Sequence, residues 1–400
     1  MRILFVALGC CLMVRTAAQI NADPLNAGSV DLRDLASALQ QDRGALLLDV
    51  RTTGEFRDTS RHVGLNMGHL ERAMNVPVDS IGTRFPDLLP YRNRPIYVYC
   101  SHSQRSRRVR DQLVDSGFTV VHNVNEGLSG YWHDRVGHAD LAPLIRTDLP
   151  YRLEDPYGLC TLLSTGGTTV LDVRPDSLFA QDHVSERTRA MGHIANAIHI
   201  PLSDLSARLD EIPSDRPTLV VDDHGMDSPK AALMLVDAGF QEVHVLFDGL
   251  DALLSASADQ LPCLGTGWLY DRPYRNVTLG DLDTTSFRNS MLVLDVRPDA
   301  EYDGTATPAW KNVGRIPFAL HVPADAIGTT LPGFELFPDD PVLVVGRSND
   351  EMVYRAALKL CALGFTRVNV LADGIGGMRW AVRNHKGMAP WSSFLDSPGH

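Results

Sequence analysis

The sequence predicts an α/β protein of three tandem domains, each a doubly wound, mostly parallel sheet with helices on both faces. Two observations predict this fold class. One ordered set of motifs occurs three times along the chain, and each set alternates short β-branched runs with stretches of helical periodicity. Alternating strands and helices form parallel sheets covered on both faces, because each connection between parallel strands has to cross over the sheet.

The repeat is clearest where the first central strand of each unit ends. Residues 46–51 read LLLDVR, and the pattern returns as VLDVR at 170–174 and as LVLDVR at 292–297. Each unit continues with a Gly-His or Gly-Arg pair, a triplet ending in proline, a second apolar run, a Gly-Phe pair and an acid-Gly pair. Internal repetition on this scale indicates one supersecondary unit used three times.

The domain boundaries follow from the repeat and from the turn-forming residues that bound its elements. Short β-branched runs bounded by turn residues are typical of buried strands, and the run from Val109 to Gly117 has the pattern of an amphipathic helix with a glycine C-cap. Segments with scattered proline and glycine separate the units. We therefore expect domains at 28–135, 153–256 and 275–383, linkers at 136–152 and 257–274, and a tail at 384–400.

The charge of the chain is acidic overall but unevenly distributed. The 37 basic and 49 acidic residues give a net charge of −12, which argues against nucleic acid as a partner and against acidic membranes. Residues 28–135 carry 14 basic and 13 acidic side chains, whereas residues 136–400 carry 21 and 35. The first third is therefore the part in which we expect a small anion to be handled.

The N-terminus has the form of a secretory signal peptide. Arg2 precedes an apolar run at 3–14 and small residues at 16–18, and such a run is too short to span a bilayer. We expect residues 1–18 to direct export, most simply to the periplasm, without a stable membrane anchor. A cytoplasmic chain with a short apolar start is the alternative, and Gly9-Cys10 leaves lipidation open.

Four cysteines follow that segment, and their spacing predicts no metal site. They form no Cys-x-x-Cys pair and no metal-ligand spacing with histidine, so we expect no structural zinc. Cys361 lies in an apolar helical pattern typical of a core. Cys160 and Cys263 bracket the middle unit and would pair only in an oxidising compartment, a question that the sequence leaves open.

The remaining cysteine, Cys100, opens a loop that is suited to anion chemistry. The loop reads CSHSQRS over residues 100–106, follows an apolar strand and leads directly into a basic helix. A short loop between a strand end and a helix N-terminus directs several backbone N–H groups at one point and so binds anions. The same groups and a nearby guanidinium would stabilise the Cys100 thiolate, which is the nucleophilic form.

On these motifs the first unit resembles a catalytic rhodanese domain. The resemblance rests on the Asp-Val-Arg strand end, the Gly68-His69 pair, the Asn-x-Pro triplet at 75–77 and the Cys-x4-Arg-Ser loop. It implies that Cys100 takes a sulfane sulfur from an anionic donor such as thiosulfate and passes it to cyanide or a thiol, without metal or cofactor. Arg105 would bind the sulfonate end of the donor. The implied substrate-binding residues, whose N–H groups would hold the persulfide, are Ser101, His102, Ser103, Gln104 and Ser106.

Two residues of the loop and its length bear on the predicted sulfur-transfer activity. Ser103 stands where the family commonly has glycine, which leaves loop conformation and rate open. His102 is favoured as a packing or substrate-tuning residue, because the chemistry needs no base and His224 matches it in a unit without a nucleophile. Cysteine phosphatases use a wider Cys-x5-Arg loop, so the four-residue spacing favours sulfur transfer. Arsenate reduction stays open, although no resolving cysteine is nearby.

The second and third units lack the reactive groups. Aligned from the proline before the strand, Asp222 and Gly346 replace Cys100, while Asp227 and Glu351 replace Arg105. An acid in place of the arginine repels anions. We expect these units to be inactive and to serve as scaffold or, through their acidic loops, to contact a protein partner or the basic mouth around Cys100.

Other repeated motifs are expected to be structural. Asp49 and Arg51 have counterparts in all three units and are expected to make strand-end hydrogen bonds or an ion pair, and His69 is expected to be structural. The sequence thus predicts a thiosulfate sulfurtransferase with one active unit. The alternative is a non-enzymatic sulfur carrier or partner-binding protein, which would not turn over repeatedly with small donors.

Overall fold

The computed structural model describes residues 28–181, 184–256, 261, 263–270, 272–285, 287–331, 336–385 and 387–396. The predicted signal at 1–18 lies outside these residues. Within them, no helix has both the length and the apolar composition needed to cross a membrane.

The first domain contains a five-stranded sheet in the order β1-β6-β5-β2-β4, with every pair parallel. Its strands are β1 (Ser29–Val30), β2 (Leu46–Asp49), β4 (Met74–Asn75), β5 (Ile96–Tyr99) and β6 (Val121–Val124). Its helices are α1 (Leu32–Gln41), α2 (Thr53–Phe56), α3 (Phe85–Leu88), α4 (Gln104–Asp115) and α5 (Gly127–His133), with single turns η2 (Val63–Leu65), η3 (Val78–Ser80) and η4 (Leu89–Tyr91).

Both faces of this sheet are covered, as expected for apolar parallel strands. Leu47 and Tyr97 pack on α1 and α5, whereas Leu46, Leu48 and Val98 pack on α4. The alternation of side chains along β2 therefore divides the core into two layers.

The second and third domains repeat this topology, which confirms the predicted fold class. Their sheets have the orders β8-β13-β12-β9-β11 and β15-β19-β18-β16-β17. The second domain comprises β8 (Arg152–Glu154), α6 (Pro156–Thr165), β9 (Thr169–Asp172), α7 (Asp176–Phe179), α8 (Glu186–Ala190), β11 (Ile198–His199), η6 (Leu205–Ala207), η7 (Leu209–Glu211), β12 (Thr218–Val221), α9 (Ser228–Asp237), β13 (Val243–Leu246) and η8 (Gly249–Ser255). The third comprises β15 (Arg275–Val277), η9 (Leu279–Asp281), α11 (Phe287–Ser290), β16 (Leu292–Asp295), α12 (Asp299–Tyr302), η10 (Ala309–Lys311), β17 (Leu320–His321), η11 (Ala324–Ala326), α13 (Ile327–Thr330), β18 (Val342–Val345), α14 (Glu351–Ala362), β19 (Val368–Leu371) and α15 (Gly374–Asn384).

The described parts of the linkers and of the tail pack on the domains. The first linker contains η5 (Ala139–Leu144) and β7 (Ile145–Arg146), and β7 pairs with β3 (His69–Leu70). The second contains α10 (Leu264–Gly267) and β14 (Trp268–Leu269), and β14 pairs with β10 (His193–Ile194). The tail forms η13 (Ala389–Phe394), whose Trp391 is buried in the core of the third domain.

The predicted strand-end ion pair is present in each domain. Arg51 Nη2 lies 2.7 Å from Asp49 Oδ2 with both side chains fully buried, and it also donates to the Gly68 carbonyl at 2.7 Å. Equivalent pairs join Arg174 to Asp172 and Arg297 to Asp295. His69 stacks on Phe56 with ring centroids 4.2 Å apart. These motifs therefore have the structural roles that their repetition predicts.

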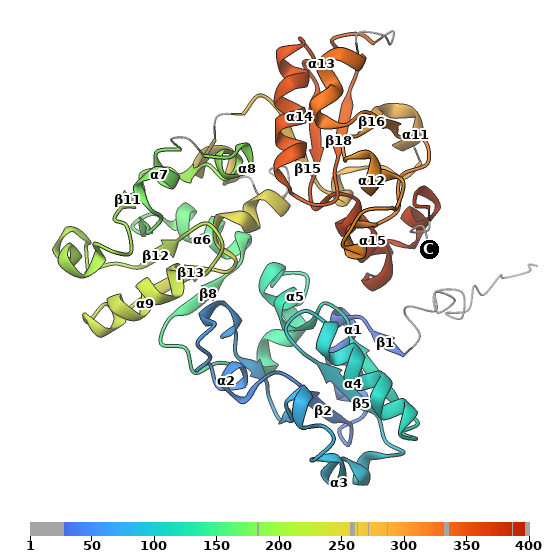
Figure 1. Ribbon diagram of the computed structural model, residues 1–400. Coiled ribbons are helices and arrows are strands. Elements are labelled where there is room, and N and C mark those ends of the chain that lie inside the picture. Colours follow the sequence, from blue (N-terminus) through green and yellow to red (C-terminus); the bar gives the residue numbers. More distant parts are fainter. Residues whose placement is uncertain are drawn as a thin grey trace, which may run out of the picture.

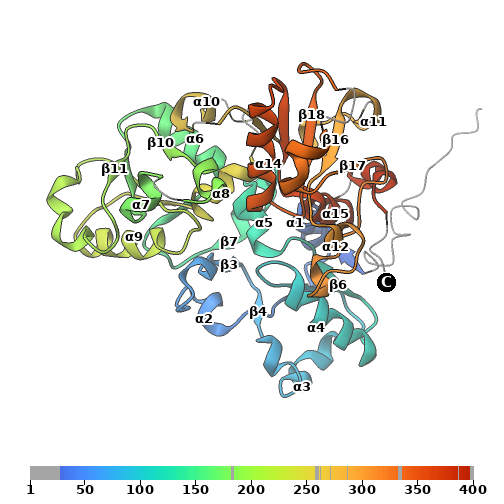
Figure 2. The ribbon, with the colours of Figure 1, turned by 45° about the horizontal axis from the view of Figure 1, so that its top comes forward.

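The three domains form a closed ring, visible in Figures 1 and 2 as three lobes around α5. An acidic residue with positive φ precedes the glycine that starts α5, η8 and α15 in turn. Each of these acids meets a polar side chain from the end of the preceding domain in the ring. The contacts are His133 Nε2 with Asp248 Oδ2 at 2.6 Å, Ser255 Oγ with Asp373 Oδ1 at 2.7 Å, and His385 Nδ1 with Glu126 Oε1 at 3.0 Å.

Candidate active site

Cys100 lies between β5 and α4, at the carboxyl end of a central strand. It is 1% exposed, and its Sγ lies 3.5 Å from Ser106 Oγ. The first turn of α5 contacts the loop, because Leu128 N donates to the Cys100 carbonyl at 2.9 Å. Gly127 has φ +65°, and a Cβ there would lie 2.5 Å from the Cys100 carbonyl oxygen, so only glycine fits.

Arg105 is held in place by Glu55, a residue to which the sequence assigned no role. Arg105 Nη1 and Nη2 donate to the two Glu55 carboxylate oxygens at 2.8 and 2.7 Å, and Nη2 also donates to Ser101 Oγ at 3.0 Å. These hydrogen bonds raise the pKa of Arg105, against the effect of burial, and the nearby Cys100 sulfur raises it further. The two Nη groups of Arg105, which the resemblance implies would bind the sulfonate end of the donor, are therefore already engaged by Glu55.

Glu55 is positioned by the start of α2. Thr52 and Glu55 form a capping box, in which the Thr52 side chain accepts from Glu55 N and the Glu55 carboxylate accepts from Thr52 N. Burial raises the pKa of Glu55, but hydrogen bonds from Arg105 and Thr52 outweigh it and lower the pKa to about 2. The Thr-x-x-Glu pattern was readable from the sequence as a helix start, but not as a contact of Arg105.

Asn123 is a second side chain of the site that the sequence did not reveal. It is fully buried on β6, accepts from Ser106 Oγ at 2.7 Å, and donates to Ser103 Oγ at 3.0 Å. The other domains have Val245 and Val370 at this place on the strand. The only available signal was a polar residue at a strand position that is valine in the other two units.

Ser103 adopts the conformation for which the family commonly uses glycine. Its φ is +69°, the same value as that of Gly225 at the corresponding position of the second domain. A side chain in this region costs roughly 1–2 kcal/mol. The hydrogen bond from Asn123 offsets part of that cost. The backbone at Ser103 therefore keeps the φ that glycine has in the second domain.

The second domain reveals what the loop does to an anion. Asp222 takes the place of Cys100, and its carboxylate accepts hydrogen bonds from the backbone N–H groups of four residues and from one hydroxyl group. The donors, at 2.6 to 3.1 Å, are the N–H groups of Gly225, Met226, Asp227 and Ser228 and the Oγ of Ser228. Burial still leaves the pKa of Asp222 raised. The loop thus converges its donors on one buried negative charge.

The acidic loop of the third domain contacts a neighbouring domain. Glu351 accepts from the backbone N–H groups of Glu186 and Arg187 at 3.0 and 2.9 Å, at the start of α8. The acidic loop of the third domain therefore serves packing between domains of the chain. Its contact is with the second domain and not with the basic mouth around Cys100.

The predicted site residues thus separate into two groups. Cys100, Ser101, Ser103, Arg105 and Ser106 are brought together by the hydrogen bonds described above. His102 and Gln104 are exposed at the rim of the loop. Desolvation lowers the pKa of His102, and the Asp248 carboxylate of the second domain acts against it, so the second domain borders the mouth of the site.

Parts of the chain are similar in sequence to curated proteins. The curated tRNA uridine(34) hydroxylase of Yersinia pestis (strain Pestoides F) is 27% identical over 124 residues, which are 30% of this chain and 35% of that protein. The uncharacterized protein YqhL of Bacillus subtilis (strain 168) is 32% identical over 85 residues, 21% of this chain and 59% of that protein. The chain therefore matches about a third of the first relative's length and less than two thirds of the second's.

The chain is also similar to a solved structure and matches a family model. A thiosulfate sulfurtransferase from Pseudomonas aeruginosa superposes with a TM-score of 0.24 and 18% identity, over 86% of this chain and 66% of that chain. The model of the rhodanese-like domain matches residues 32–134, 157–256 and 278–379. Since these three matches cover most of the chain and coincide with three copies of one sheet topology, the protein belongs to the rhodanese-like family.

Proposed function

We propose that the protein is a sulfurtransferase that moves a sulfane sulfur from thiosulfate, or a related anionic donor, to cyanide or a thiol through a persulfide on Cys100. Membership of the rhodanese-like family supports sulfur transfer as the class of reaction. The observation that carries the proposal is the convergence of loop N–H groups on Asp222, because Cys100 occupies the same place in the same loop.

The reaction has two balanced steps. The Cys100 thiolate attacks the outer sulfur of thiosulfate, a new S–S bond forms, and sulfite leaves with the electron pair of the old one. The terminal sulfur of the persulfide then bears the negative charge, which the N–H groups of residues 101–106 stabilise. Cyanide attacks that sulfur, thiocyanate leaves, and the thiolate is restored.

The roles of the neighbouring groups follow from their contacts. Arg105 lends positive charge to the incoming donor through the N–H groups that Glu55 does not occupy. Ser106 contacts the sulfur, and Asn123 fixes Ser106, so Asn123 is a positioning residue. The second and third domains carry no thiol in this loop and act as scaffold.

Export to an oxidising compartment, such as the periplasm, is part of the proposal. It is supported by the disulfide between Cys160 and Cys263, whose Cα atoms lie 5.2 Å apart. Such bonds persist outside the reducing cytoplasm. Cys100 and Cys361 remain free thiols.

The test compares three proteins lacking residues 1–18: the parent, Cys100→Ser and, as a matched control, Cys361→Ser. Thiocyanate formation from thiosulfate and cyanide is measured, and intact mass is measured after thiosulfate alone. We expect the parent and Cys361→Ser to turn over and to gain one sulfur, and Cys100→Ser to do neither. A stable persulfide that does not pass to cyanide supports the sulfur-carrier alternative, and no mass gain in the parent rejects the proposal for thiosulfate.

A further inference from the structure

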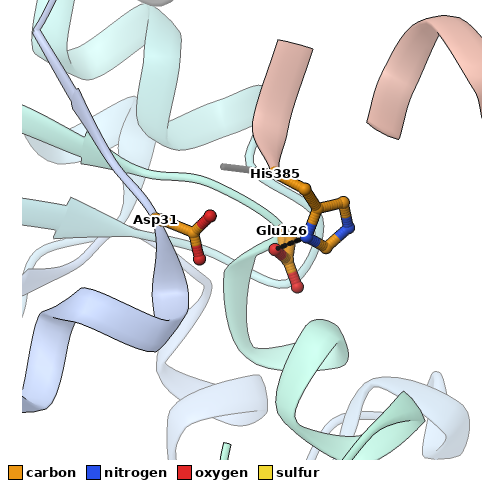
Figure 3. A group of neighbouring side chains, drawn as sticks. All are labelled: Asp31, Glu126 and His385. Carbon is orange, nitrogen blue, oxygen red and sulfur yellow. Dashed lines mark ion pairs between the residues drawn. The ribbon is translucent and has the colours of Figure 1, made fainter. Parts of the chain in front are cut away.

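We propose that the joint between the first and third domains is a pH-sensitive clasp, which protonated His385 closes against Glu126 and which loosens when that imidazole loses its proton (Figure 3). Glu126 precedes α5 in the first domain, and His385 follows α15 in the third. His385 Nδ1 lies 3.0 Å from Glu126 Oε1, and the Glu126 side chain is 3% exposed. A buried carboxylate in contact with an imidazole is held more strongly when that ring is positively charged.

Apolar packing supports the other two joints of the ring but not this one. One buried apolar cluster spans the first and second domains, and another spans the second and third. Within the residues that the structure describes, no such cluster spans the third and first domains. The joint between the first and second domains also contains an imidazole, that of His133, but the apolar cluster backs its contact with Asp248. The joint at His385 therefore depends more on charge than the other two.

The charges around His385 favour its protonated form. A carboxylate oxygen of Asp31, the N-cap of α1, lies within 4.8 Å of a ring nitrogen of His385, and the Arg33 guanidinium acts against that ring's charge. On its own side, His385 meets the edge or face of the uncharged Trp380 ring, with centroids 5.1 Å apart. Burial lowers the pKa of His385, but its contact with Glu126 and the two nearby carboxylate charges outweigh burial. The net result is a pKa of His385 above its ordinary value.

A second imidazole also ties the charge around Glu126 to pH. His138 is 3% exposed, and its Nε2 lies 3.5 Å from Glu126 Oε2. Its Nδ1 lies 2.7 Å from the Asp134 carbonyl, which only accepts, so Nδ1 carries a proton. His138 Nε2 therefore attracts the Glu126 carboxylate only when the ring is an imidazolium. When the ring is neutral, a nitrogen lone pair faces the carboxylate instead, and the Glu126 charge loses a second partner.

Like charges on the two sides of the joint oppose the clasp. Arg107 lies in the first turn of α4, and Arg383 lies in the last turn of α15. Burial lowers the pKa of Arg107 and the charge of Arg383 lowers it further, so the two guanidinium groups repel each other across the joint. Loss of the His385 charge removes an attraction and leaves this repulsion in place. The joint should then loosen.

The direction of the pH effect follows from the raised pKa of His385. The clasp stabilises the closed ring fully below the ordinary histidine pKa of about 6.5, and this stabilisation is lost as the pH rises through the higher pKa of the folded chain. The change reaches the candidate active site, because Glu126 leads directly into α5. In the first turns of α5, Leu128 N donates to the Cys100 carbonyl and Ser129 N donates to the Ser101 carbonyl.

The test compares four full-length chains: the parent, His385→Gln, Glu126→Gln and, as a matched control, His62→Gln, which changes an exposed histidine outside the joint. Amide hydrogen exchange is measured by mass spectrometry at about pH 5.5 and about pH 8.5, on either side of the ordinary histidine pKa, and corrected for the intrinsic rate at each pH. The reporting segment is α15. The reference segment is η8, whose joint contact, between Ser255 and Asp373, contains no imidazole.

We expect the corrected exchange of the last turn of α15 to be at least about tenfold faster at the higher pH in the parent and in His62→Gln, with η8 unchanged. His385→Gln and Glu126→Gln should exchange at the faster rate at both pH values. The proposal is overturned if the parent shows no such change, if His385→Gln keeps it, or if η8 changes equally. Glu126→Gln is isosteric, so the result does not depend on His385→Gln alone. None of these readouts depends on sulfur transfer.

Discussion

Glu55 sets the charge of the candidate site before any donor arrives. Its side chain is 3% exposed and that of Arg105 is 26% exposed, so the pair is largely shielded from water. A buried pair of this kind costs several kcal/mol to break when one partner is removed, since the other charge stays behind. Glu55 thus holds the Arg105 guanidinium in place and reduces the net positive charge that a donor meets.

The lowered pKa of Glu55 makes this pair measurable. A carboxyl whose pKa falls from 4.5 to about 2 on folding stabilises the fold fully above pH 4.5, and this stabilisation is lost as the pH falls toward 2. A shift of this size corresponds to about 3 kcal/mol. We expect Glu55→Gln to lower the urea midpoint of unfolding at neutral pH and to converge on the parent in acid. Parallel pH profiles for the two proteins would show that the pair contributes nothing.

Asn123 offers a test in which the other domains supply the control residue. Asn123→Val introduces the residue found at this place in β13 and β19, so the strand should still fold. It leaves the hydroxyl groups of Ser103 and Ser106 without their partner, at a cost of about 1–3 kcal/mol. We expect the rate of thiocyanate formation to fall at least about tenfold, by steady-state assay. The double variant with Ser106→Ala should recover stability but not rate.

At this scale the sequence indicated which loop residues lie together, but not the side chains that hold them in place. Cys100, Arg105 and the loop serines form a contiguous motif and could be read directly. Glu55 and Asn123 reach the motif from other strands and helices, and a single sequence contains no signal for contacts across such distances. The Asp49–Arg51 pair was predictable, because both residues belong to one short repeated motif.

At the scale of elements, the shape of the loop depends on one residue in the left-handed region. Ser103→Gly would relieve backbone strain of roughly 1–2 kcal/mol and lose one hydrogen bond worth about 1 kcal/mol. We expect its stability and its kcat/KM for thiosulfate to stay close to those of the parent. Ser103→Val, which cannot take φ +69° without strain, should lose most of its activity. If Ser103→Gly is as inactive as Ser103→Val, the bond to Asn123 matters more than φ.

Strands and helices of the repeat were largely predictable from periodicity. The central strands are buried on both faces, and α4 includes residues 109–115 of the predicted amphipathic run, which Gly117 follows with φ +87°. The strands β7 and β14, each two residues long, were not predictable, because such short pairs leave no periodic pattern. The buried Trp391 of η13 was missed for the same reason, since a six-residue turn cannot establish a period.

At the scale of the whole molecule, the ring determines which loops are accessible. In the second domain, η2 of the first domain packs on the loop so closely that a Cβ on Gly64 would lie 3.1 Å from the Gly225 carbonyl oxygen. In the third domain, α8 of the second domain covers the loop through Arg187 and Glu351. In the third domain, η10 occupies the place in the repeat that η2 and α8 occupy in the other two. Its Trp310 is 63% exposed. Such an arrangement arises from contacts between domains, which repeat patterns alone do not specify.

This packing predicts that restoring the loop sequence will not restore activity in the second domain. The triple variant Cys100→Ser, Asp222→Cys and Asp227→Arg places the proposed nucleophile and the proposed donor-binding arginine in the second loop. The new arginine would still lack a carboxylate partner, because Leu178 stands where the first domain has Glu55, and the loop would remain under η2. We therefore expect no thiocyanate formation above that of Cys100→Ser alone, with the circular dichroism spectrum unchanged. Activity within tenfold of the parent would instead mean that the loop residues suffice, and that neither Glu55 nor the packing of the ring limits the chemistry.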